Sequence, residues 1–200
     1  MSGKAAFQAA TNVSRETFEM LEAYEKLLLA WNPKINLVAP STLDELWVRH
    51  FLDSAQLVEI ASVVDAWVDL GSGGGFPGAI VAILTGGKTV LIESDQRKAA
   101  FLRTVARETC GFKVISKRIE DVPPQNADVV SARALAPLSV LLGYVQPHLK
   151  DGGSAVLLKG KKAKDEIREA LEHWRFDCET YPSKTDPEAV VLKIGDIQSA

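Results

Sequence analysis

Val68-Asp69-Leu70-Gly71-Ser72-Gly73-Gly74-Gly75-Phe76-Pro77-Gly78 is the stretch that decides the fold. It begins with apolar residues around one carboxylate, has glycine at four of positions 71–75, and leads into the apolar run Ala79–Leu84. This order is typical of a buried strand, a loop without side-chain bulk and the start of a helix. Because the N–H groups at a helix start are free to bind, we expect a ligand to lie against bare backbone here.

Strands and helices alternate on the C-terminal side of this loop. Repeated β-α units predict a doubly wound, Rossmann-like α/β sheet, whose ligands lie at the carboxyl ends of the strands. The expected strands are 66–70, 89–92, 113–116, 128–131 and 154–158, the expected helices are 77–84, 96–109, 138–149 and 164–174, and two last strands, 178–181 and 189–194, predict a C-terminal antiparallel hairpin.

The N-terminal part of the chain predicts helices only. Residues 1–13 are expected to form a loose tail. Apolar residues at three- and four-residue steps predict a helix from an N-cap at Ser14 to Trp31, ended by Asn32-Pro33. A capping-box pattern predicts a second helix that starts at Thr42. We therefore expect an N-terminal helical cap on the main sheet.

Length and composition limit the classes of protein that are possible. The 200 residues fit one compact unit, which we divide into a cap, 1–64, and a main domain, 65–200. No apolar run approaches the roughly 18 residues of a membrane span, and no signal layout precedes residue 12, so we expect a cytoplasmic protein without a membrane partner. Two cysteines are too few for a disulfide framework or a zinc site, and we expect no metal.

Three kinds of ligand use glycine loops of this type. A dinucleotide loop requires G-x-G-x-x-G, and its third glycine, counted from the first in the loop, falls on Phe76. A phosphate-binding P-loop fails because Ala82 stands where its first glycine is required. The S-adenosylmethionine loop, acidic-x-G-x-G-x-G, matches at every position, namely Asp69, Gly71, Gly73 and Gly75. The loop therefore favours a methyl donor, with a dinucleotide as the alternative.

Two further strand ends carry residues suited to a nucleoside. Glu93 follows the second strand, about 20 residues beyond the loop, where an acidic side chain accepts both ribose hydroxyls. Ile119 and Glu120 follow the third strand and could hold an adenine ring. Together with the glycine loop, these residues predict a nucleoside-shaped site.

The residues expected near a methyl acceptor limit how that acceptor is activated. The fourth strand ends in Ser131-Ala132-Arg133-Ala134, which lacks the Asn/Asp-Pro-Pro-aromatic loop common in amine methylation of bases. Neither Cys110 nor Cys178 lies at the expected active edge, so a cysteine nucleophile is also excluded. What remains is an acceptor that is already nucleophilic, such as a ring nitrogen, a hydroxyl or a carboxylate.

Basic residues cluster in two regions of this acidic chain. One cluster begins at Arg97 and Lys98, and the other contains Lys159, Lys161 and Lys162 after the fifth strand. Such clusters are candidate phosphate-binding faces for RNA, although a solvated helix surface explains the first equally well.

Several segments resemble one known family. Arg49-His50-Phe51-Leu52-Asp53-Ser54, the glycine loop, Glu93 to Leu102, Ser131 to Ala134 and Leu158-Lys159-Gly160 occur in the order found in bacterial small-subunit rRNA guanine-N7 methyltransferases, also called glucose-inhibited division protein B. The resemblance runs from about Trp31 to Ile194.

The resemblance implies an enzyme that binds S-adenosylmethionine and methylates N7 of one guanosine near the decoding region of 16S rRNA. Its partner is then 16S rRNA or an assembling small subunit, and we expect a monomer. The resemblance places Glu93 on the ribose, gives Arg133 a positioning role without acid–base catalysis, and implies donor contacts from Gly71, Phe76, Ile119, Glu120 and Arg133. We assign Arg49 and His50 to bracing the cap against the glycine loop.

Two alternatives stay open at this point. The chain could methylate a nitrogen or oxygen of a small molecule. It could also be a ribosome-assembly module that binds RNA and keeps a degenerate donor site. Methyl incorporation into RNA distinguishes both from the leading hypothesis.

Overall fold

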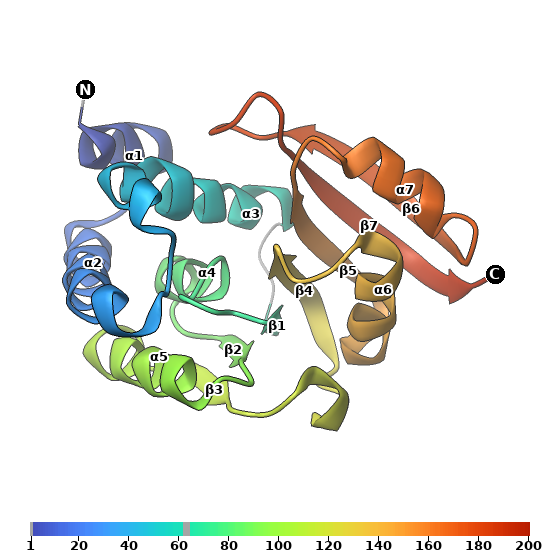
Figure 1. Cartoon of the computed structure of the whole chain (residues 1–200), viewed down its shortest axis with the longest axis horizontal. Coiled ribbons are helices and arrows are strands. Elements are labelled where there is room, and N and C mark those ends of the chain that lie inside the picture. Colours follow the sequence, from blue (N-terminus) through green and yellow to red (C-terminus); the bar gives the residue numbers. More distant parts are fainter. Residues whose placement is uncertain (1, 62–64) are drawn as a thin grey trace.

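The computed structural model describes residues 2–61 and 65–200, which form helices around one seven-stranded sheet (Figure 1). The strand order is β3-β2-β1-β4-β5-β7-β6. The first five strands of the chain are parallel, and β7 lies antiparallel between β5 and β6. The predicted α/β sheet and C-terminal hairpin are confirmed. The strands are β1 (Trp67–Leu70), β2 (Thr89–Ile92), β3 (Lys113–Ile115), β4 (Ala127–Arg133), β5 (Leu149–Lys159), β6 (Trp174–Pro182) and β7 (Val190–Ser199).

The strand order places a topological switch point at β1. From β1 the chain moves outward through β2 to β3, and then returns to β4 on the other side of β1. The loops that follow β1 and β4 therefore leave the sheet side by side in opposite directions. Ligands of open α/β sheets bind in the crevice at this point. The glycine loop follows β1 and Arg133 ends β4, so both predicted site segments meet there.

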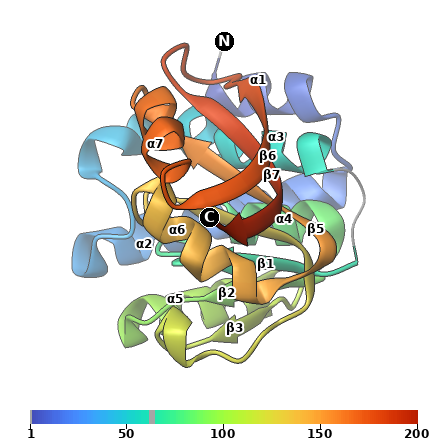
Figure 2. The same ribbon diagram turned by 90° about the vertical axis from the view of Figure 1, so that its right-hand side faces the viewer.

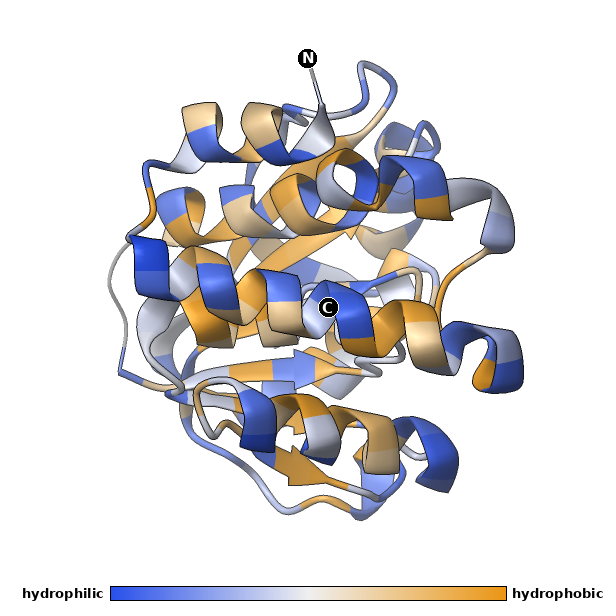
Figure 3. Ribbon diagram, turned by 90° about the vertical axis from the view of Figure 1, so that its left-hand side faces the viewer, coloured by the Kyte–Doolittle hydropathy of each residue, from blue (hydrophilic) through white to orange (hydrophobic). Residues whose placement is uncertain are grey.

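Helices cover both faces of the sheet (Figure 2). Alternate strand residues point to opposite faces. Trp67 and Val129 belong to a buried cluster with Leu57 and Val81, whereas Val68 and Val130 belong to a cluster with residues of α6. The helices are α1 (Gly3–Thr11), α2 (Arg15–Ile35), α3 (Asp53–Ala61), α4 (Gly78–Thr85), α5 (Gln96–Glu108), α6 (Leu138–Val145) and α7 (Ala163–Ala170). Hydrophilic and hydrophobic stripes alternate on the helices nearest the viewer in Figure 3, as amphipathic packing requires.

The N-terminal residues form a helix, so the expected loose tail is wrong. Ser2 caps α1 by accepting a hydrogen bond from the Ala5 N–H. Phe7 is fully buried and packs edge-on against Trp47, with ring centroids 5.3 Å apart. A single large apolar residue was too weak a periodic signal to predict this helix. Its burial against the cap stabilises α1.

The helix α2 has the predicted N-cap but not the predicted end. Ser14 accepts a hydrogen bond from the Thr17 N–H, as expected. The helix continues through Pro33 to Ile35 and ends at Asn36, whose φ of 48° is left-handed. The Asn36 N–H donates to the Asn32 carbonyl, and the buried Asn32 side chain accepts from the Val38 N–H. Proline is tolerated here because it removes only one hydrogen bond in the last turn.

The predicted capping box at Thr42 is also wrong. A 3₁₀ helix, Pro40–Glu45, begins earlier, because Pro40 sets the backbone of its first position. The Thr42 hydroxyl donates to the Ala39 carbonyl and does not cap a helix start. A π-helical segment, Trp47–Leu52, then leads directly into α3.

The buried core of the cap is continuous with that of the sheet layer. Leu21, Tyr24 and Phe51 from the cap share one cluster with Phe76 and Phe101. The expected division at residue 64 falls on 62–64, outside the described residues.

Candidate functional site

The glycine loop between β1 and α4 has a backbone that only glycine adopts easily. Gly71, Gly73 and Gly75 have φ angles of 63°, 56° and 99°, and side chains are strained in this region. These are the three glycines of the acidic-x-G-x-G-x-G pattern, whereas Gly74 has no positive φ. The Gly75 and Phe76 N–H groups both donate to the Ser72 carbonyl, which closes the turn. The spacing of the three glycines therefore matches the three positions at which the loop backbone has a positive φ.

The three positive-φ glycines differ in what surrounds them. A methyl group on Gly71 would meet Leu135, and one on Gly75 would meet Tyr24, Ala79 and Leu102. At Gly73 the nearest atom would be the Gly71 carbonyl oxygen at 3.9 Å. The loop is thus packed from below and open above Gly73. A ligand would approach the bare backbone from that side.

Glu93, at the end of β2, reaches across to this open side. Its Oε2 accepts from the Gly73 N–H at 2.7 Å, and its Oε1 accepts from the Asp95 N–H at 2.8 Å. The side chain is 7 % exposed. Two backbone donors therefore fix the carboxylate beside the loop, and each oxygen keeps a lone pair for a further donor such as a hydroxyl.

Asp69 lies beneath the loop and not on its open side. It is fully buried, and its Oδ1 accepts from the Ser131 hydroxyl at 2.6 Å, which in turn accepts from the Trp67 indole N–H. Its Oδ2 has no hydrogen-bond partner within the described part of the chain. The carboxylate thus supports the loop from below, and the place of Asp69 in the donor-binding site stays a prediction.

Burial raises the pKa of Asp69 from 3.8 to about 6, and its hydrogen bond from Ser131 opposes that shift. The folded state therefore favours the protonated acid, and wild-type stability falls as pH rises from about 4 through about 6. The difference between the ordinary pKa of 3.8 and the folded-state pKa of about 6 corresponds to about 3 kcal/mol of stability, at about 1.4 kcal/mol per pKa unit. We expect Asp69→Asn to gain stability relative to wild type by about this amount between pH 4 and pH 7.5. Chemical denaturation at a series of pH values measures it, and a pH-independent difference contradicts the raised pKa.

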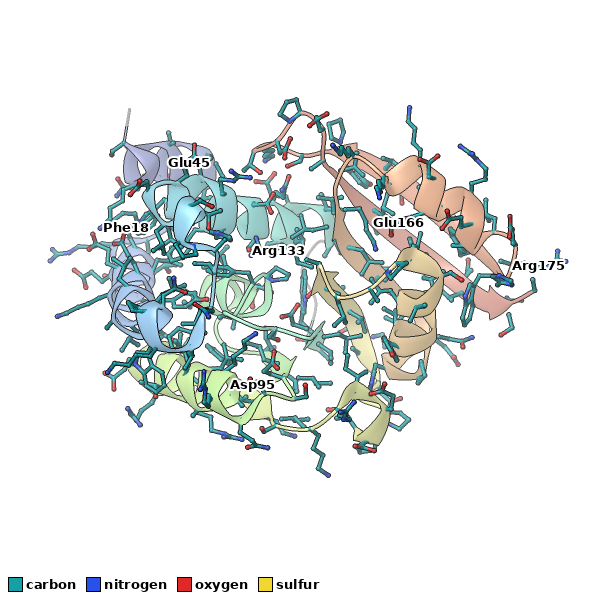
Figure 4. The ribbon with its side chains drawn as sticks, viewed as in Figure 1. Phe18, Glu45, Asp95, Arg133, Glu166 and Arg175 are labelled. Atoms are coloured by element: carbon teal, nitrogen blue, oxygen red, sulfur yellow. The ribbon has the colours of Figure 1, made fainter. Side chains whose placement is uncertain are left out.

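Arg133 leaves the end of β4 and points into the cap (Figure 4). Its guanidinium donates to His50 Nδ1 at 2.8 Å and lies 3.6 Å from the Asp53 carboxylate and 5.0 Å from the centre of the Phe76 ring. The Arg49 contribution is its backbone carbonyl, which accepts from Arg133 at 3.4 Å. Arg133 therefore links His50 and Asp53 of the cap to Phe76, which directly follows Gly75.

The contacts of His50 fix its protonation state. Arginine only donates hydrogen bonds, so Nδ1 is the acceptor and the ring proton is on Nε2, 2.8 Å from the Thr42 hydroxyl. Burial, together with the positive charges of Arg133 and Arg49, lowers the pKa of His50 from 6.5 to about 3. The imidazole is neutral at physiological pH and both its nitrogens are occupied. Its contacts fit a brace between cap and loop, as expected, and exclude a role as a general base.

Tyr24 is a site residue that the sequence did not reveal. It is fully buried in α2, its hydroxyl donates to the Gly74 carbonyl, and its ring stacks on Phe51 and Phe76. In the sequence it was one apolar position on an amphipathic helix. Only the packing of the cap brings it to the loop 50 residues away.

Ile119 and Glu120 belong to a short 3₁₀ helix, Ile119–Asp121, which follows β3 along the chain. Strand β3 ends beside Glu93, because the Glu93 N–H donates to the Ile115 carbonyl. Ile119 is half-buried and Glu120 is exposed. The three predicted strand ends are therefore neighbours along one edge of the sheet.

A cavity of about 630 Å³ opens at the ends of β4 and β5, beside this edge. Leu135 lines it, and the same side chain packs over Gly71, so the Leu135 side chain lies between the cavity and the glycine loop. The cavity is lined by charged side chains of both signs, which are Asp53, Arg133, Lys159, Lys162, Asp165, Glu166 and Glu169.

The lysines and the arginine that were predicted to face RNA differ in their exposure and in their contacts. Lys159 is 8 % exposed and is held by Glu166 at 2.7 Å and the Ala136 carbonyl at 2.8 Å. It therefore supports the junction between β5 and α7 and also lines the cavity at the ends of β4 and β5, and its contact with RNA stays a prediction. Lys161 and Lys162 are exposed, as is Arg97, whereas Lys98 is half-buried.

No group of three or more His, Cys, Asp or Glu residues is placed to hold a metal ion in residues 2–61 and 65–200. In the same ranges no helix combines the length and hydropathy needed to span a bilayer.

A family model described as "rRNA small subunit methyltransferase G", GidB, matches residues 17–188. The chain belongs to this family. A Ribosomal RNA small subunit methyltransferase G from Ruegeria sp. (strain TM1040) is 50 % identical over 194 residues, which cover 94 % of each chain. The resemblance expected from the ordered motifs is confirmed.

Solved structures share the fold of this GidB-family chain at low sequence identity. An O-methyltransferase from Bacillus cereus in complex with SAH has a TM-score of 0.62 at 13 % identity, covering 95 % of this chain and 96 % of that chain. Fibrillarin from Aeropyrum pernix with natively bound S-adenosyl-L-methionine has a TM-score of 0.56 at 16 % identity, covering 74 % and 75 %. These likenesses support the methyltransferase sheet.

Proposed function

We propose that the chain transfers a methyl group from S-adenosylmethionine to N7 of one guanosine in 16S rRNA, near the decoding region. Membership of the rRNA small subunit methyltransferase G family supports this activity. The observation that carries it is the glycine loop, which is open above Gly73 and flanked there by the Glu93 carboxylate. The position of the methylated base rests on the resemblance of the motifs.

The residues present fit the methyl donor. The open backbone above Gly73 leaves room that a Cβ would fill, and Glu93 keeps lone pairs for the ribose hydroxyls. Ile119 and Glu120 lie at the neighbouring strand end, where the adenine would bind. Gly71, Gly75, Phe76 and Arg133 complete the proposed donor site, and Asp69 supports it from below.

The donor supplies a methyl group on a positively charged sulfur, which is ready for in-line displacement. The work of this chain is then to position the acceptor. Guanine N7 carries a lone pair and no proton at neutral pH, so its methylation requires no general base. The engaged, neutral His50 agrees with that chemistry. We propose that the target nucleotide enters the cavity at the ends of β4 and β5, beside the glycine loop.

The proposed partner is 16S rRNA, alone or in an assembling small subunit. Exposed Arg97, Lys161 and Lys162, together with Lys98, are the proposed contacts with its phosphates. Because that substrate is made in the cytoplasm, we propose that the chain acts there. We also propose that it acts as a monomer and that cap 1–64 and domain 65–200 work as one compact unit.

Methyl incorporation into RNA tests the proposed function. The purified chain is incubated with S-adenosylmethionine labelled in the methyl group and with unmodified 16S rRNA or small subunits. We expect about one methyl group per RNA, located as 7-methylguanosine by cleavage at N7-methylated positions. Labelling of small molecules without labelling of RNA supports the small-molecule alternative, and RNA binding without any methyl transfer supports the assembly-module alternative. Either result overturns the proposal.

A further inference from the structure

Asp53, the first residue of α3, connects three segments of the chain through one carboxylate: α3, the connection between β6 and β7, and the end of β4. Its Oδ1 accepts from Gln56 Nε2 at 2.9 Å, from the Thr185 hydroxyl at 2.7 Å and from the Ser183 hydroxyl at 3.4 Å. Its Oδ2 faces Arg133 at 3.6 Å. Three neutral donors therefore fix one oxygen and leave the other directed at the guanidinium.

The connection between β6 and β7 holds this arrangement in place. The Lys184 N–H donates to Gln56 Oε1 at 3.0 Å, and its ammonium pairs with Glu59 on the same helix. The connection is thus attached to α3 at several points. Because these bonds surround Asp53, its carboxylate cannot rotate away from Arg133 without breaking them.

Arg133 has one carboxylate at ion-pair distance within the described ranges, and that carboxylate is Asp53. Both side chains are largely buried, with 20 % and 15 % of their surfaces exposed. The other polar contacts of the guanidinium, His50 Nδ1 and the Arg49 carbonyl, are neutral. Asp53 is therefore the negative charge nearest to Arg133, and the buried Asp69 acts on the guanidinium from beyond ion-pair distance.

The charge balance matters because the two nucleosides that visit the site differ in charge. S-adenosylmethionine carries a sulfonium, an ammonium and a carboxylate, hence a net charge of +1 at neutral pH. S-adenosylhomocysteine, its product, has a thioether and a net charge of zero. An unbalanced arginine next to the site would repel the donor more than the product.

We propose that Asp53 is a positioning residue that holds Arg133 over Phe76 and balances its charge, so that a cationic methyl donor binds beside an arginine. This inference rests on the proposed donor-binding role of Arg133. It assigns to Asp53 a part in discriminating donor from product, in addition to its contacts within the fold.

Calorimetric titration of Asp53→Asn with both nucleosides tests the charge balance. We expect the affinity for S-adenosylmethionine to fall about tenfold more than that for S-adenosylhomocysteine, the size expected for one charge acting over roughly 10 Å at an effective dielectric constant of about 20. Asp53→Glu keeps the charge and should keep the affinity ratio. Thr185→Val removes a neutral hydrogen bond to the same carboxylate and should also keep the ratio. Equal losses for the two nucleosides in Asp53→Asn overturn the proposal.

A double-mutant cycle tests whether Asp53 positions the guanidinium. In Arg133→Met there is nothing to position, so adding Asp53→Asn should no longer lower the affinity for the uncharged S-adenosylhomocysteine. An undiminished loss in that background overturns the positioning role. Unchanged affinities in Arg133→Met itself instead refute the proposed donor site. If Asp53→Asn does not fold, Asp53→Glu carries the test: the displaced carboxylate should lower both affinities while the ratio stays, and a changed ratio overturns the proposal.

Discussion

Gly75→Ala is expected to lower the free energy of unfolding by about 3–5 kcal/mol and to abolish binding of the methyl donor. Gly75 has a φ of 99°, which strains any side chain. Its added methyl group would overlap the Tyr24 hydroxyl and lie 3.0 Å from Ala79 Cβ. Tyr24 has no room to retreat, because its ring packs in one buried cluster with Phe51 and Phe76, whose ring centroids lie 5.3 Å and 5.6 Å from its own and 5.8 Å from each other. Denaturant titration measures the stability, and calorimetry with S-adenosylmethionine measures the binding.

Gly111→Ala is the matched control for this substitution. Gly111 also has a positive φ, 77°, but a methyl group there would meet no atom within 4 Å. It should cost only the backbone strain, about 1–2 kcal/mol, and leave donor binding intact. If the two variants lose the same stability, close packing of the cap under the loop is not what Gly75 provides.

The difference between these glycines shows what the sequence could and could not reveal. The spacing Asp69-x-Gly71-x-Gly73-x-Gly75 predicted the loop, because its chemistry is contained in consecutive residues. That Gly75 packs against Tyr24, and Gly71 against Leu135, depends on segments about 50 and 60 residues away. No local pattern encodes those contacts.

The same distinction applies to the surroundings of single residues. The end of each strand fixed where Glu93, Ile119 and Arg133 would lie, because parallel strands end at a common edge. The sequence could not show whether a charge at that edge would be free or occupied. Lys159 was expected to face RNA, and in the fold its ammonium group is paired with Glu166 of α7. Asp69 matched the loop pattern, yet the pleat of β1 turns it beneath the loop.

The cap was the least predictable part for a related reason. Its 3₁₀ and π segments have weak local signals, and their conformation follows from packing of Trp47 and Phe51 against the cap core. Pro33 was an obvious helix end, but Asn32 and Asn36 supply the hydrogen bonds that let α2 continue one more turn. Tertiary contacts overrode the local rule in each place.

Glu93→Gln is expected to weaken binding of S-adenosylmethionine by about 100-fold or more and to lower the free energy of unfolding by about 1–3 kcal/mol. Both carboxylate oxygens accept backbone N–H groups, one from Gly73 and one from Asp95. Glutamine has only one acceptor oxygen, so its NH₂ group must face an N–H donor in either orientation. The loop then loses its tie to β2, and the ribose loses a charged acceptor.

Asp95→Asn provides the matched control. Asp95, like Glu93, accepts two backbone N–H groups, but it does so with one oxygen, whereas Glu93 uses both of its oxygens. Asp95 caps α5 by accepting the Arg97 and Lys98 N–H groups with the same oxygen, Oδ1. Asparagine keeps that oxygen and is itself a good N-cap, so little stability and no donor affinity should be lost. Asp95→Asn removes a charge at this edge and keeps both hydrogen bonds, whereas Glu93→Gln removes a charge and one of two acceptor oxygens. Comparing the two variants therefore separates the effect of the charge from that of the lost acceptor. Equal effects of Glu93→Gln and Asp95→Asn on calorimetric affinity would show that Glu93 does not join the loop to the donor.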